Sequence, residues 1–342
     1  MKEKLLGKTL DELKTAAVEA GLKPFVGRQL AEWLYGKRAS SWERMTNISK
    51  ASKEALQSKF DLGTAPPAGR ALSSDGTVKY LFKVGEGSNA VEAVMIPEDD
   101  RKTLCVSSQA GCKMGCRFCM TGRQGFHGNL DAADILNQFL SIDNPVELTN
   151  TVFMGMGEPL DNYEAVSRVM EILTADWGFG WSPKRITLST IGVIPTLRRY
   201  LDSFRCHLAV SLHNPFPEER MEMMPVEKAY ACEDVIDLLR QYDFSGQRRV
   251  SFEYTMFSGW NDDKRHADAL IRLLRGLECR VNLIRFHKIP GSALESSDNI
   301  AMEAFRDRLN NNRIVCTIRK SRGEDILAAC GMLAGQHSSQ SQ

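Results

Sequence analysis

The sequence lacks any run of about 18 consecutive apolar residues, the length that a membrane-spanning helix needs. Its first residues, MKEKLLGKTLDELK, contain no apolar stretch and no small-residue cleavage site, so we expect no secretory signal peptide. An excess of one charge is also missing, because 44 lysine and arginine residues balance 43 aspartate and glutamate residues. This balance does not require a nucleic-acid partner, although it is compatible with a locally basic face. These absences predict a cytoplasmic protein without membrane contact.

Cysteine, in contrast, is well represented, with nine residues among 342. In a reducing compartment such cysteines bind metals or perform chemistry rather than form structural disulfides. Three of them, Cys112, Cys116 and Cys119, lie in the segment GCKMGCRFCMTG with the spacing C-x3-C-x2-C. Cysteine metal sites usually close with four ligands, so this triplet leaves one position unfilled.

The first 62 residues have the pattern of a small helical domain. Thr9 and Glu12 form a capping-box signature that opens one helix, and Gly21 ends it. Two further helices are predicted around residues 28–35 and 49–60. Basic residues lie beside tryptophan and tyrosine in this region, so we expect this domain to contact RNA if the protein binds RNA.

Residues 63–98 are interpreted as a linker followed by a β-hairpin extension. The segment GTAPPAGR is rich in proline and glycine, as linkers are. The sequence after it alternates apolar and polar residues between turn signals, which is typical of a hairpin. At the other end of the chain, residues 335–342 are expected to form a disordered tail.

Between residues 99 and 334, short strand-like runs alternate with amphipathic helix-like segments such as DAADILNQFL and CEDVIDLLRQY. The strand-like runs are TLCVSS, TVFMGM, RITLST, CHLAVSLH, VSFEYTMF, RVNLIRFH and IVCTIRK. Strict alternation predicts parallel strands joined by crossover helices. About six such units are present, fewer than the eight of a closed barrel. We therefore expect an α/β fold built on a partial (β/α)6 barrel.

Two interpretations of the cysteine triplet compete. In the first, a fourth cysteine closes a zinc or iron–sulfur centre, and Cys105 is the nearest candidate. Cys105, however, lies inside a predicted strand, whereas the triplet lies in the loop after it. Loops of this kind carry the chemistry of barrel enzymes. We therefore favour the second interpretation, a [4Fe-4S] cluster with three cysteine ligands and one open iron, because an open position distinguishes reactive metal sites from structural ones.

Further polar and glycine residues stand at the carboxyl ends of the predicted strands, the edge at which barrel enzymes collect functional groups. These residues are Gly157, Glu158, Ser189, Ser211, Leu212, His213 and His287. Each alone has a simpler explanation, such as a plain turn or a hydrogen-bonded core histidine. Their joint placement favours a shared binding site.

The triplet, with Phe118 before its last cysteine, resembles that of the radical S-adenosylmethionine superfamily. Together with FMGMGEPLDN, RITLSTIGVIP, LAVSLHNP and RGEDILAACGML, it resembles more narrowly the rRNA/tRNA adenine-C2 methyltransferases. The likeness spans nearly the whole chain. It is closer to these enzymes than to the related resistance methyltransferases, which act on carbon 8 of adenine.

This resemblance implies a set of cofactors and ligands. Cys112, Cys116 and Cys119 would hold the cluster, and the strand-end residues named above would bind S-adenosylmethionine, of which two molecules are used per turnover. A carboxylate such as Glu158 suits the ammonium group of that molecule. One position departs from the family, because His287 stands where asparagine is usual.

The resemblance also implies catalytic roles for Cys330, Cys105 and Glu92. Carbon 2 of adenine has no lone pair and cannot attack a methyl sulfonium, so Cys330 would first carry the methyl group. Cys105 would take the proton from carbon 2 and form a disulfide with Cys330, and Glu92 would act as a proton acceptor. Without the family, Cys330 reads as a buried thiol in an apolar helix, Cys105 as a core residue and Glu92 as a solvent-facing carboxylate.

The implied partners are 23S rRNA, tRNA and a cellular reductant such as flavodoxin or ferredoxin. Basic clusters that would suit RNA phosphates are Lys184–Arg185, Arg248–Arg249 and Arg319–Arg322. Two alternatives remain open at this point. One is methylation of carbon 8 by the same mechanism, and the other is a non-catalytic iron–sulfur protein that binds RNA or transfers electrons.

Overall fold

The structure is a computed structural model that describes residues 2–85 and 89–335. Its N-terminal part contains helices α1 (Leu10–Glu19), α2 (Phe25–Ala31) and α3 (Lys50–Lys59), and a π-helical turn, η1 (Glu32–Gly36), extends α2. The predicted capping box is present, because the Glu12 carboxylate accepts from the Thr9 amide and the Glu12 amide donates to the Thr9 hydroxyl. Strands β1 (Glu3–Lys4) and β2 (Phe60–Asp61) pair in parallel and so join the two ends of this N-terminal part.

A ten-stranded sheet organises the rest of the chain, in the order β14-β13-β12-β11-β10-β9-β6-β5-β4-β3. Its strands are β3 (Gly69–Leu72), β4 (Val78–Lys83), β5 (Ala90–Glu98), β6 (Arg101–Cys105), β9 (Asn150–Phe153), β10 (Ile186–Thr190), β11 (His207–Ser211), β12 (Val250–Met256), β13 (Arg280–Arg285) and β14 (Val315–Ile318). From β6 to β14 the neighbouring strands are all parallel. Six crossovers join these strands, so the predicted partial (β/α)6 barrel is confirmed.

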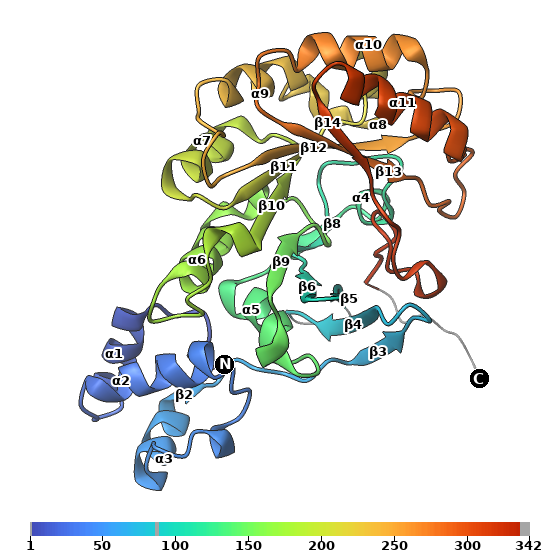
Figure 1. Ribbon diagram of the computed structural model, residues 1–342. Coiled ribbons are helices and arrows are strands. Elements are labelled where there is room, and N and C mark those ends of the chain that lie inside the picture. Colours follow the sequence, from blue (N-terminus) through green and yellow to red (C-terminus); the bar gives the residue numbers. More distant parts are fainter. Residues whose placement is uncertain (1, 86–88, 336–342) are drawn as a thin grey trace.

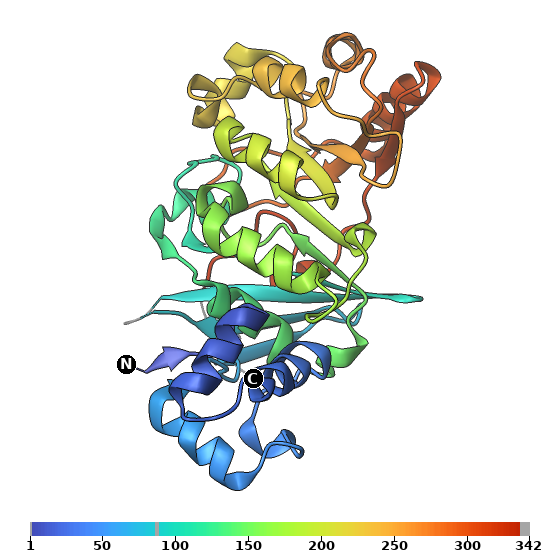
Figure 2. The same ribbon diagram turned by 90° about the vertical axis from the view of Figure 1, so that its left-hand side faces the viewer.

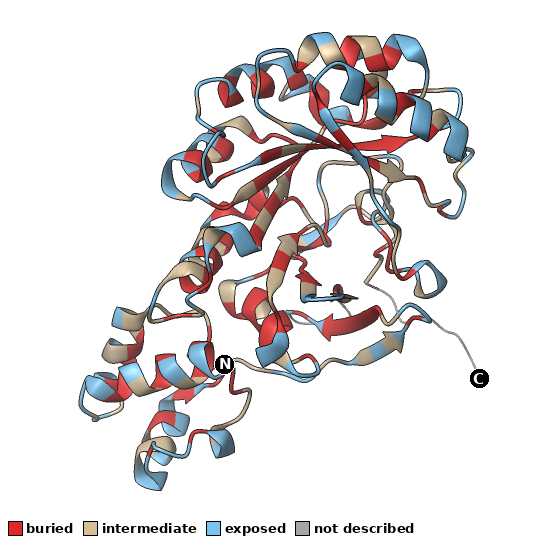
Figure 3. Cartoon of the chain, in the orientation of Figure 1, coloured by how far each residue is buried: buried red, intermediate tan, exposed pale blue. Residues whose placement is uncertain are grey.

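The crossover helices are α5 (Ala132–Leu140), α6 (Tyr163–Thr174), α7 (Ile194–Ser203), α8 (Pro217–Met223), α9 (Cys232–Leu239), α10 (Lys264–Leu273) and α11 (Asn299–Asn311). Helices α6, α7, α9, α10 and α11 cover the outer side of the curved sheet, and the N-terminal helices lie beyond β3–β5 at one end (Figures 1 and 2). Buried residues concentrate on the strands and on the helix faces turned toward them (Figure 3). The functional groups described below lie on the inner side of the sheet.

Strands β3, β4 and β5 differ from the predicted appended hairpin. They form an antiparallel meander, and β5 pairs with β6, so they continue the main sheet. The reason lies in burial, because Val78 to Phe82 are buried on both faces of β4. A strand covered on both faces belongs to a sheet interior rather than to a solvent-exposed hairpin.

Two local features around the predicted site also differ from expectation. Strands β7 (Gln109–Gly111) and β8 (Phe126–Asn129) form a small hairpin, and helix α4 (Met120–Arg123) lies between them. The apolar helix considered for the segment around Cys330 is wrong. The chain there makes only a 3-10 turn, η7 (Glu324–Ile326), and the segment after it combines local turns, such as Met332 to Ala329, with a backbone bond from Met120 to Gly331.

No helix in the described part of the chain is both long and apolar enough to cross a membrane. The predicted tail, residues 335–342, lies outside the described residues except for Gly335. The domain limits at residues 62 and 98 remain predictions.

Candidate active site

The cysteine triplet lies on a loop whose base is held by the β7–β8 hairpin. Gly111 has φ +72°, and a Cβ atom there would lie 2.0 Å from the carbonyl oxygen of Gly125. Glycine is therefore needed for the close approach of the two chain segments just before Cys112. The Cys112 amide donates to that same oxygen over 2.8 Å, and the Cys119 amide donates to the Cys116 carbonyl over 3.2 Å. The loop is thus shaped by its backbone.

A cavity of about 160 Å³ lies between this loop and the carboxyl ends of the parallel strands. Its lining includes the triplet, Cys112, Cys116 and Cys119, and five of the predicted cofactor-binding residues, Gly157, Glu158, Ser189, Ser211 and His213. Phe118 also lines it, with its ring 4.9 Å from that of His213 in an edge-on arrangement. The topology therefore brings together residues from four separate segments of the sequence.

The donor set suits a multi-iron cluster. Within residues 2–85 and 89–335, no three histidine, cysteine, aspartate or glutamate side chains are grouped closely enough to hold one metal ion. In an iron–sulfur cluster each thiolate binds a different iron, so three thiols spread along one cavity wall fit it better. Burial raises the pKa of the Cys112 thiol to about 12 and raises that of Cys116 as well. A bound cation would offset the cost of ionising these thiols.

Glu158 is the buried carboxylate of this cavity, with 4% of its surface exposed. Its two oxygens accept from the amides of Leu160 (3.0 Å) and Ile191 (2.9 Å). Burial nevertheless raises its pKa to about 7, against the opposing effect of these hydrogen bonds. The preceding Gly157 has φ +98°, and a Cβ atom there would lie 2.5 Å from the Gln109 side chain. The glycine thus allows the turn to pack against β7.

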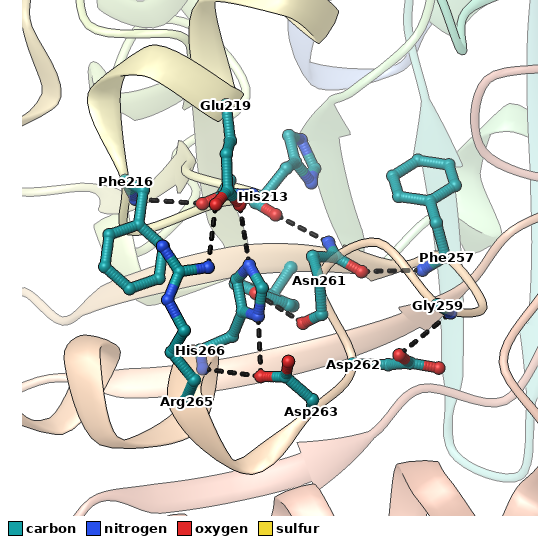
Figure 4. Close-up of polar contacts among 12 residues, drawn as sticks. His213, Phe216, Glu219, Phe257, Gly259, Asn261, Asp262, Asp263, Arg265 and His266 are labelled. Carbon is teal, nitrogen blue, oxygen red and sulfur yellow. Dashed lines mark hydrogen bonds and ion pairs between the residues drawn. The ribbon is translucent and has the colours of Figure 1, made fainter.

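His213 adopts a left-handed backbone conformation, φ +58°, that is uncommon outside glycine. Asn261, which is fully buried, donates to the carbonyls of His213 (2.7 Å) and Thr255 (2.8 Å) and accepts from the Phe257 amide (2.7 Å) (Figure 4). The Thr255 amide donates to His213 Nδ1 over 2.9 Å. Burial lowers the pKa of His213 to about 3, so the ring is neutral and its proton is on Nε2.

Next to this network, one ionic cluster joins α8 to α10. His266 places its two ring nitrogens 2.7 Å from Glu219 and 2.7 Å from Asp263, and Arg265 pairs with Glu219 over 2.8 Å (Figure 4). His266 is 3% exposed and does not line the cavity. We interpret this cluster as a structural clamp behind the His213 loop.

The end of strand β11 is held by a buried arginine. Arg220 is 1% exposed, donates to the carbonyls of Ser211 (3.0 Å) and Leu212 (2.9 Å) and pairs with Glu227. Leu212 itself is fully buried and does not line the cavity, so any contact of this residue with a cofactor would involve its backbone.

Cys330 and Cys105 come together from opposite ends of the barrel sequence. The Met120 amide donates to the Gly331 carbonyl over 2.8 Å, which fixes the C-terminal segment beside the triplet. Cys330 lines both the first cavity and a second one of about 800 Å³, which Cys105 also lines. Burial raises the pKa of the Cys105 thiol to about 12, whereas the nearby Arg319 acts in the opposite direction. Cys330 is exposed, so it is not the buried thiol considered above.

The two remaining predicted residues lie elsewhere. Glu92 is 1% exposed, so it is not the solvent-facing carboxylate considered above. It pairs with buried Lys79 over 3.0 Å and accepts from the amides of Ala334 (2.8 Å) and Gly335 (3.2 Å). His287 lies outside the first cavity, bonds to Ser321 over 3.0 Å, and leaves Phe286 to line that cavity. His287 instead lines the second cavity together with Cys105 and Cys330, whereas Glu92 lines neither cavity. The predicted roles of both residues remain predictions.

The second cavity is strongly basic. Nine lysine and arginine side chains line it, against one carboxylate among the described residues, Glu98. The basic residues are Arg101, Lys184, Arg185, Arg249, Arg280, Arg285, Arg319, Lys320 and Arg322. Arg101, Lys184, Arg185, Arg249 and Arg280 stand at the amino ends of strands, whereas the other four follow or end strands β13 and β14. This cavity therefore extends along the inside of the barrel and reaches the edge opposite to the first cavity. Residues of three separate basic motifs of the sequence thus line one cavity.

Sequence reasoning missed Glu253, Asn261 and Arg220. A signal existed for Glu253, since it is a carboxylate in the middle of the apolar strand VSFEYTM. Asn261 and Arg220 lie in loop and helix segments, and only the folded chain reveals that they are buried. Their importance depends on neighbours that are distant in sequence.

Comparisons with known proteins agree with this geometry. A family model of the radical SAM superfamily matches residues 106–270, and a model of the ribosomal RNA large subunit methyltransferase N-terminal domain matches residues 3–62. A solved radical SAM methyltransferase from Sphaerobacter thermophilus superposes with a TM-score of 0.93 at 36% identity, covering 98% of this chain and all of that one.

Curated relatives are similar over almost their full length. A probable dual-specificity RNA methyltransferase RlmN of Porphyromonas gingivalis is 61% identical over 96% of both chains. Its counterpart in Parabacteroides distasonis is 58% identical over 97% of both chains. The dual-specificity RNA methyltransferase RlmN of Syntrophobacter fumaroxidans is 40% identical over 96% of this chain and 97% of its own.

Proposed function

Because the chain belongs to the RlmN family of radical S-adenosylmethionine RNA methyltransferases, we propose that it methylates carbon 2 of an adenosine in 23S rRNA and in tRNA. One observation carries this proposal. Cys330 lines both the cavity beside the cysteine triplet and the basic cavity. A group carried on its sulfur would therefore stand between the cofactor and the RNA.

The residues of the first cavity form two groups, one that would bind the cluster and one that would bind S-adenosylmethionine. Cys112, Cys116 and Cys119 would hold a [4Fe-4S] cluster with one open iron, and the strand ends would hold S-adenosylmethionine, two molecules per turnover. When bound, these groups supply a methyl cation equivalent and a deoxyadenosyl radical. Glu158 would accept a hydrogen bond from the cofactor's ammonium group, and neutral His213 would donate one from Nε2.

The two thiols would carry the methyl group and release the product. Cys330 would hold the methyl carbon, which becomes bonded to carbon 2 of the base. Cys105 would then take the proton from carbon 2, and its sulfur would bond to the Cys330 sulfur as the carbon–sulfur bond breaks. The hydrogen atom that the methyl carbon loses when it bonds to carbon 2 would go to the deoxyadenosyl radical, and the unpaired electron of the adduct would go to the oxidised cluster. The electron pair of the broken carbon–sulfur bond would stay with the methylene carbon, which would take up a proton to become the new methyl group. A cellular reductant, such as flavodoxin, ferredoxin or a thiol system, would restore the thiols and the cluster.

The basic cavity supports entry of the RNA from the amino ends of the strands. Clustered lysine and arginine side chains bind phosphates, and an adenosine flipped out of a loop would reach Cys105 and Cys330 at the inner end of this cavity. The N-terminal domain would add contacts. Lys37 there lies 3.9 Å from the centre of the Trp33 ring, a pair that suits a stacked nucleotide and its phosphate.

The most direct test traps the proposed intermediate. The Cys105→Ala variant, incubated with S-adenosylmethionine, reductant and RNA, should accumulate a protein–RNA conjugate joined through Cys330, because the proton at carbon 2 cannot be removed. Mass spectrometry of the digested conjugate would locate the bond. Cys316→Ala is the matched control, since Cys316 is a buried thiol on β14 that lines neither cavity, and it should turn over without trapping.

Two alternatives give different outcomes in the same experiments. Methylation of carbon 8 would be identified by the methyl position in the product nucleoside, assigned by NMR. A non-catalytic iron–sulfur protein would need a fourth ligand, and Cys330 is the further cysteine that lines the triplet's cavity. That alternative predicts loss or change of the cluster in Cys330→Ala and no conjugate in Cys105→Ala.

A further inference from the structure

A polar row crosses the inner face of the barrel between the two cavities. The strand register places Ser211 opposite Glu253, Glu253 opposite Asn282, and Asn282 opposite Thr317. Glu253 lines the first cavity beside Cys330, whereas Asn282 and Thr317 line the basic one. The Glu253 carboxylate therefore lies where the two cavities meet.

The two oxygens of this carboxylate have different surroundings. Oε1 accepts from Asn282 Nδ2 over 2.8 Å and from the Ser251 hydroxyl over 3.0 Å. Oε2 accepts no hydrogen bond although it is buried, and the Glu253 residue is only 3% exposed. Arg319, which extends from the basic cavity, forms an ion pair with Oε2 over 3.5 Å. A buried carboxylate oxygen that has an ion-pair partner but accepts no hydrogen bond calls for a functional explanation.

We propose that Glu253 reads the substituent on carbon 6 of the target base, with Oε2 accepting a hydrogen bond from the exocyclic amino group of adenine. This inference rests on the proposed function, which places an adenosine beside Cys330. A carboxylate only accepts hydrogen bonds. It therefore matches the amino group of adenine and repels the carbonyl oxygen that guanine and hypoxanthine carry at the same position.

The polar row also predicts what a conservative substitution does. In Glu253→Gln the amide oxygen stays at the Oε1 position, because Asn282 Nδ2 can only donate there. The amide nitrogen then occupies the Oε2 position and presents a donor. The variant therefore offers a donor where the wild type offers an acceptor, so the preference between amino and carbonyl groups should reverse.

The test uses cluster-loaded protein with S-adenosylmethionine and no reductant, so that binding is measured without turnover. The RNA is a 23S fragment whose target position carries adenosine, inosine or purine riboside, and fluorescence anisotropy gives the dissociation constants. Wild type should bind adenosine RNA about tenfold more tightly than inosine RNA, with purine riboside between them. Glu253→Gln should bind inosine RNA more tightly than adenosine RNA.

Glu98→Gln is the matched control, because it removes the same charge from the basic cavity without touching the row, and it should keep the wild-type preference. If Glu253→Gln changes both affinities equally, Glu253 only holds Arg319 and the inference is overturned. If Glu253→Gln does not fold, the wild-type affinities are the test. Equal wild-type affinity for adenosine RNA and purine riboside RNA also overturns the inference. Failure of the proposed function is recognised separately, because reduced wild type would then methylate no adenosine.

Discussion

At the scale of single residues, burial of Glu158 changes the pH at which its carboxyl group ionises in the ligand-free protein. Burial raises its pKa to about 7 from the ordinary 4.5, so the folded protein binds a proton here more tightly than the unfolded chain does. This contribution to stability is full below about pH 4.5 and is lost as the pH rises through about 7. An ammonium group bound to Glu158 would reverse the effect and release the proton.

We therefore expect the contribution of Glu158 to the free energy of unfolding of cluster-free protein, taken as the wild-type value minus the value for Glu158→Gln, to fall between about pH 4.5 and pH 7. Glu158→Gln, which cannot ionise, should lose this part of the pH dependence. Urea unfolding followed by circular dichroism at each pH measures both proteins. Identical pH profiles would contradict the assignment.

Asn261 is the second residue whose effect can be isolated. Asn261→Ala removes the donors that hold the His213 and Thr255 carbonyls, leaves buried groups unpaired and should cost about 1–3 kcal/mol of stability. It should also weaken binding of S-adenosylmethionine, measured by calorimetry on cluster-loaded protein. Asn310→Ala is the control, because Asn310 makes comparable backbone bonds to Cys316 far from the cavity and should lower stability alone.

At the scale of elements, the C-terminal segment depends on partners outside itself. Glu92 accepts from Ala334 and Gly335, while the Thr121 hydroxyl donates to Leu333. Glu92→Gln would leave the buried Lys79 charge without its partner, at a cost of about 3–5 kcal/mol. Amide hydrogen exchange of residues 328–335 should become faster.

The double variant Lys79→Met/Glu92→Gln separates the two effects. It removes the unpaired charge and should recover most of the stability. Its C-terminal segment should still exchange faster than in wild type, because the anionic acceptor is absent. Wild-type protection of this segment in both variants would show that Glu92 does not anchor it.

The sequence predicted the elements whose signals are local. Alternation of strands and helices identified the seven parallel strands, and the spacing of three cysteines identified the loop. The reading of DILAACGML as a helix failed because the carbonyls of Gly331 and Leu333 accept hydrogen bonds from Met120 and Thr121 of α4, which are distant in the sequence. Similarly, Glu253 and Arg319 lie 66 positions apart in sequence (253 and 319), and only strand order brings them together.

At the scale of the whole molecule, a nearly neutral chain concentrates its positive charge at one barrel opening. We expect RNA binding to weaken with salt, and Arg280→Ala to reduce the slope of log affinity against log salt by about 0.7–0.9. Arg275→Ala, after helix α10 and outside the basic cavity, should leave the slope unchanged. Anisotropy at several salt concentrations measures this, and equal slopes in all three proteins would argue against entry through this cavity.

We expect three protein thiolates to hold the cluster and to leave one iron free for a small ligand. Mössbauer and electron paramagnetic resonance spectra of anaerobically purified protein test it most directly, with and without S-adenosylmethionine, in wild type and Cys330→Ala. We predict a four-iron cluster in both proteins, with one iron whose signal changes when the ligand is added. A cluster whose spectrum ignores the ligand, or that is altered by loss of Cys330, would contradict the account.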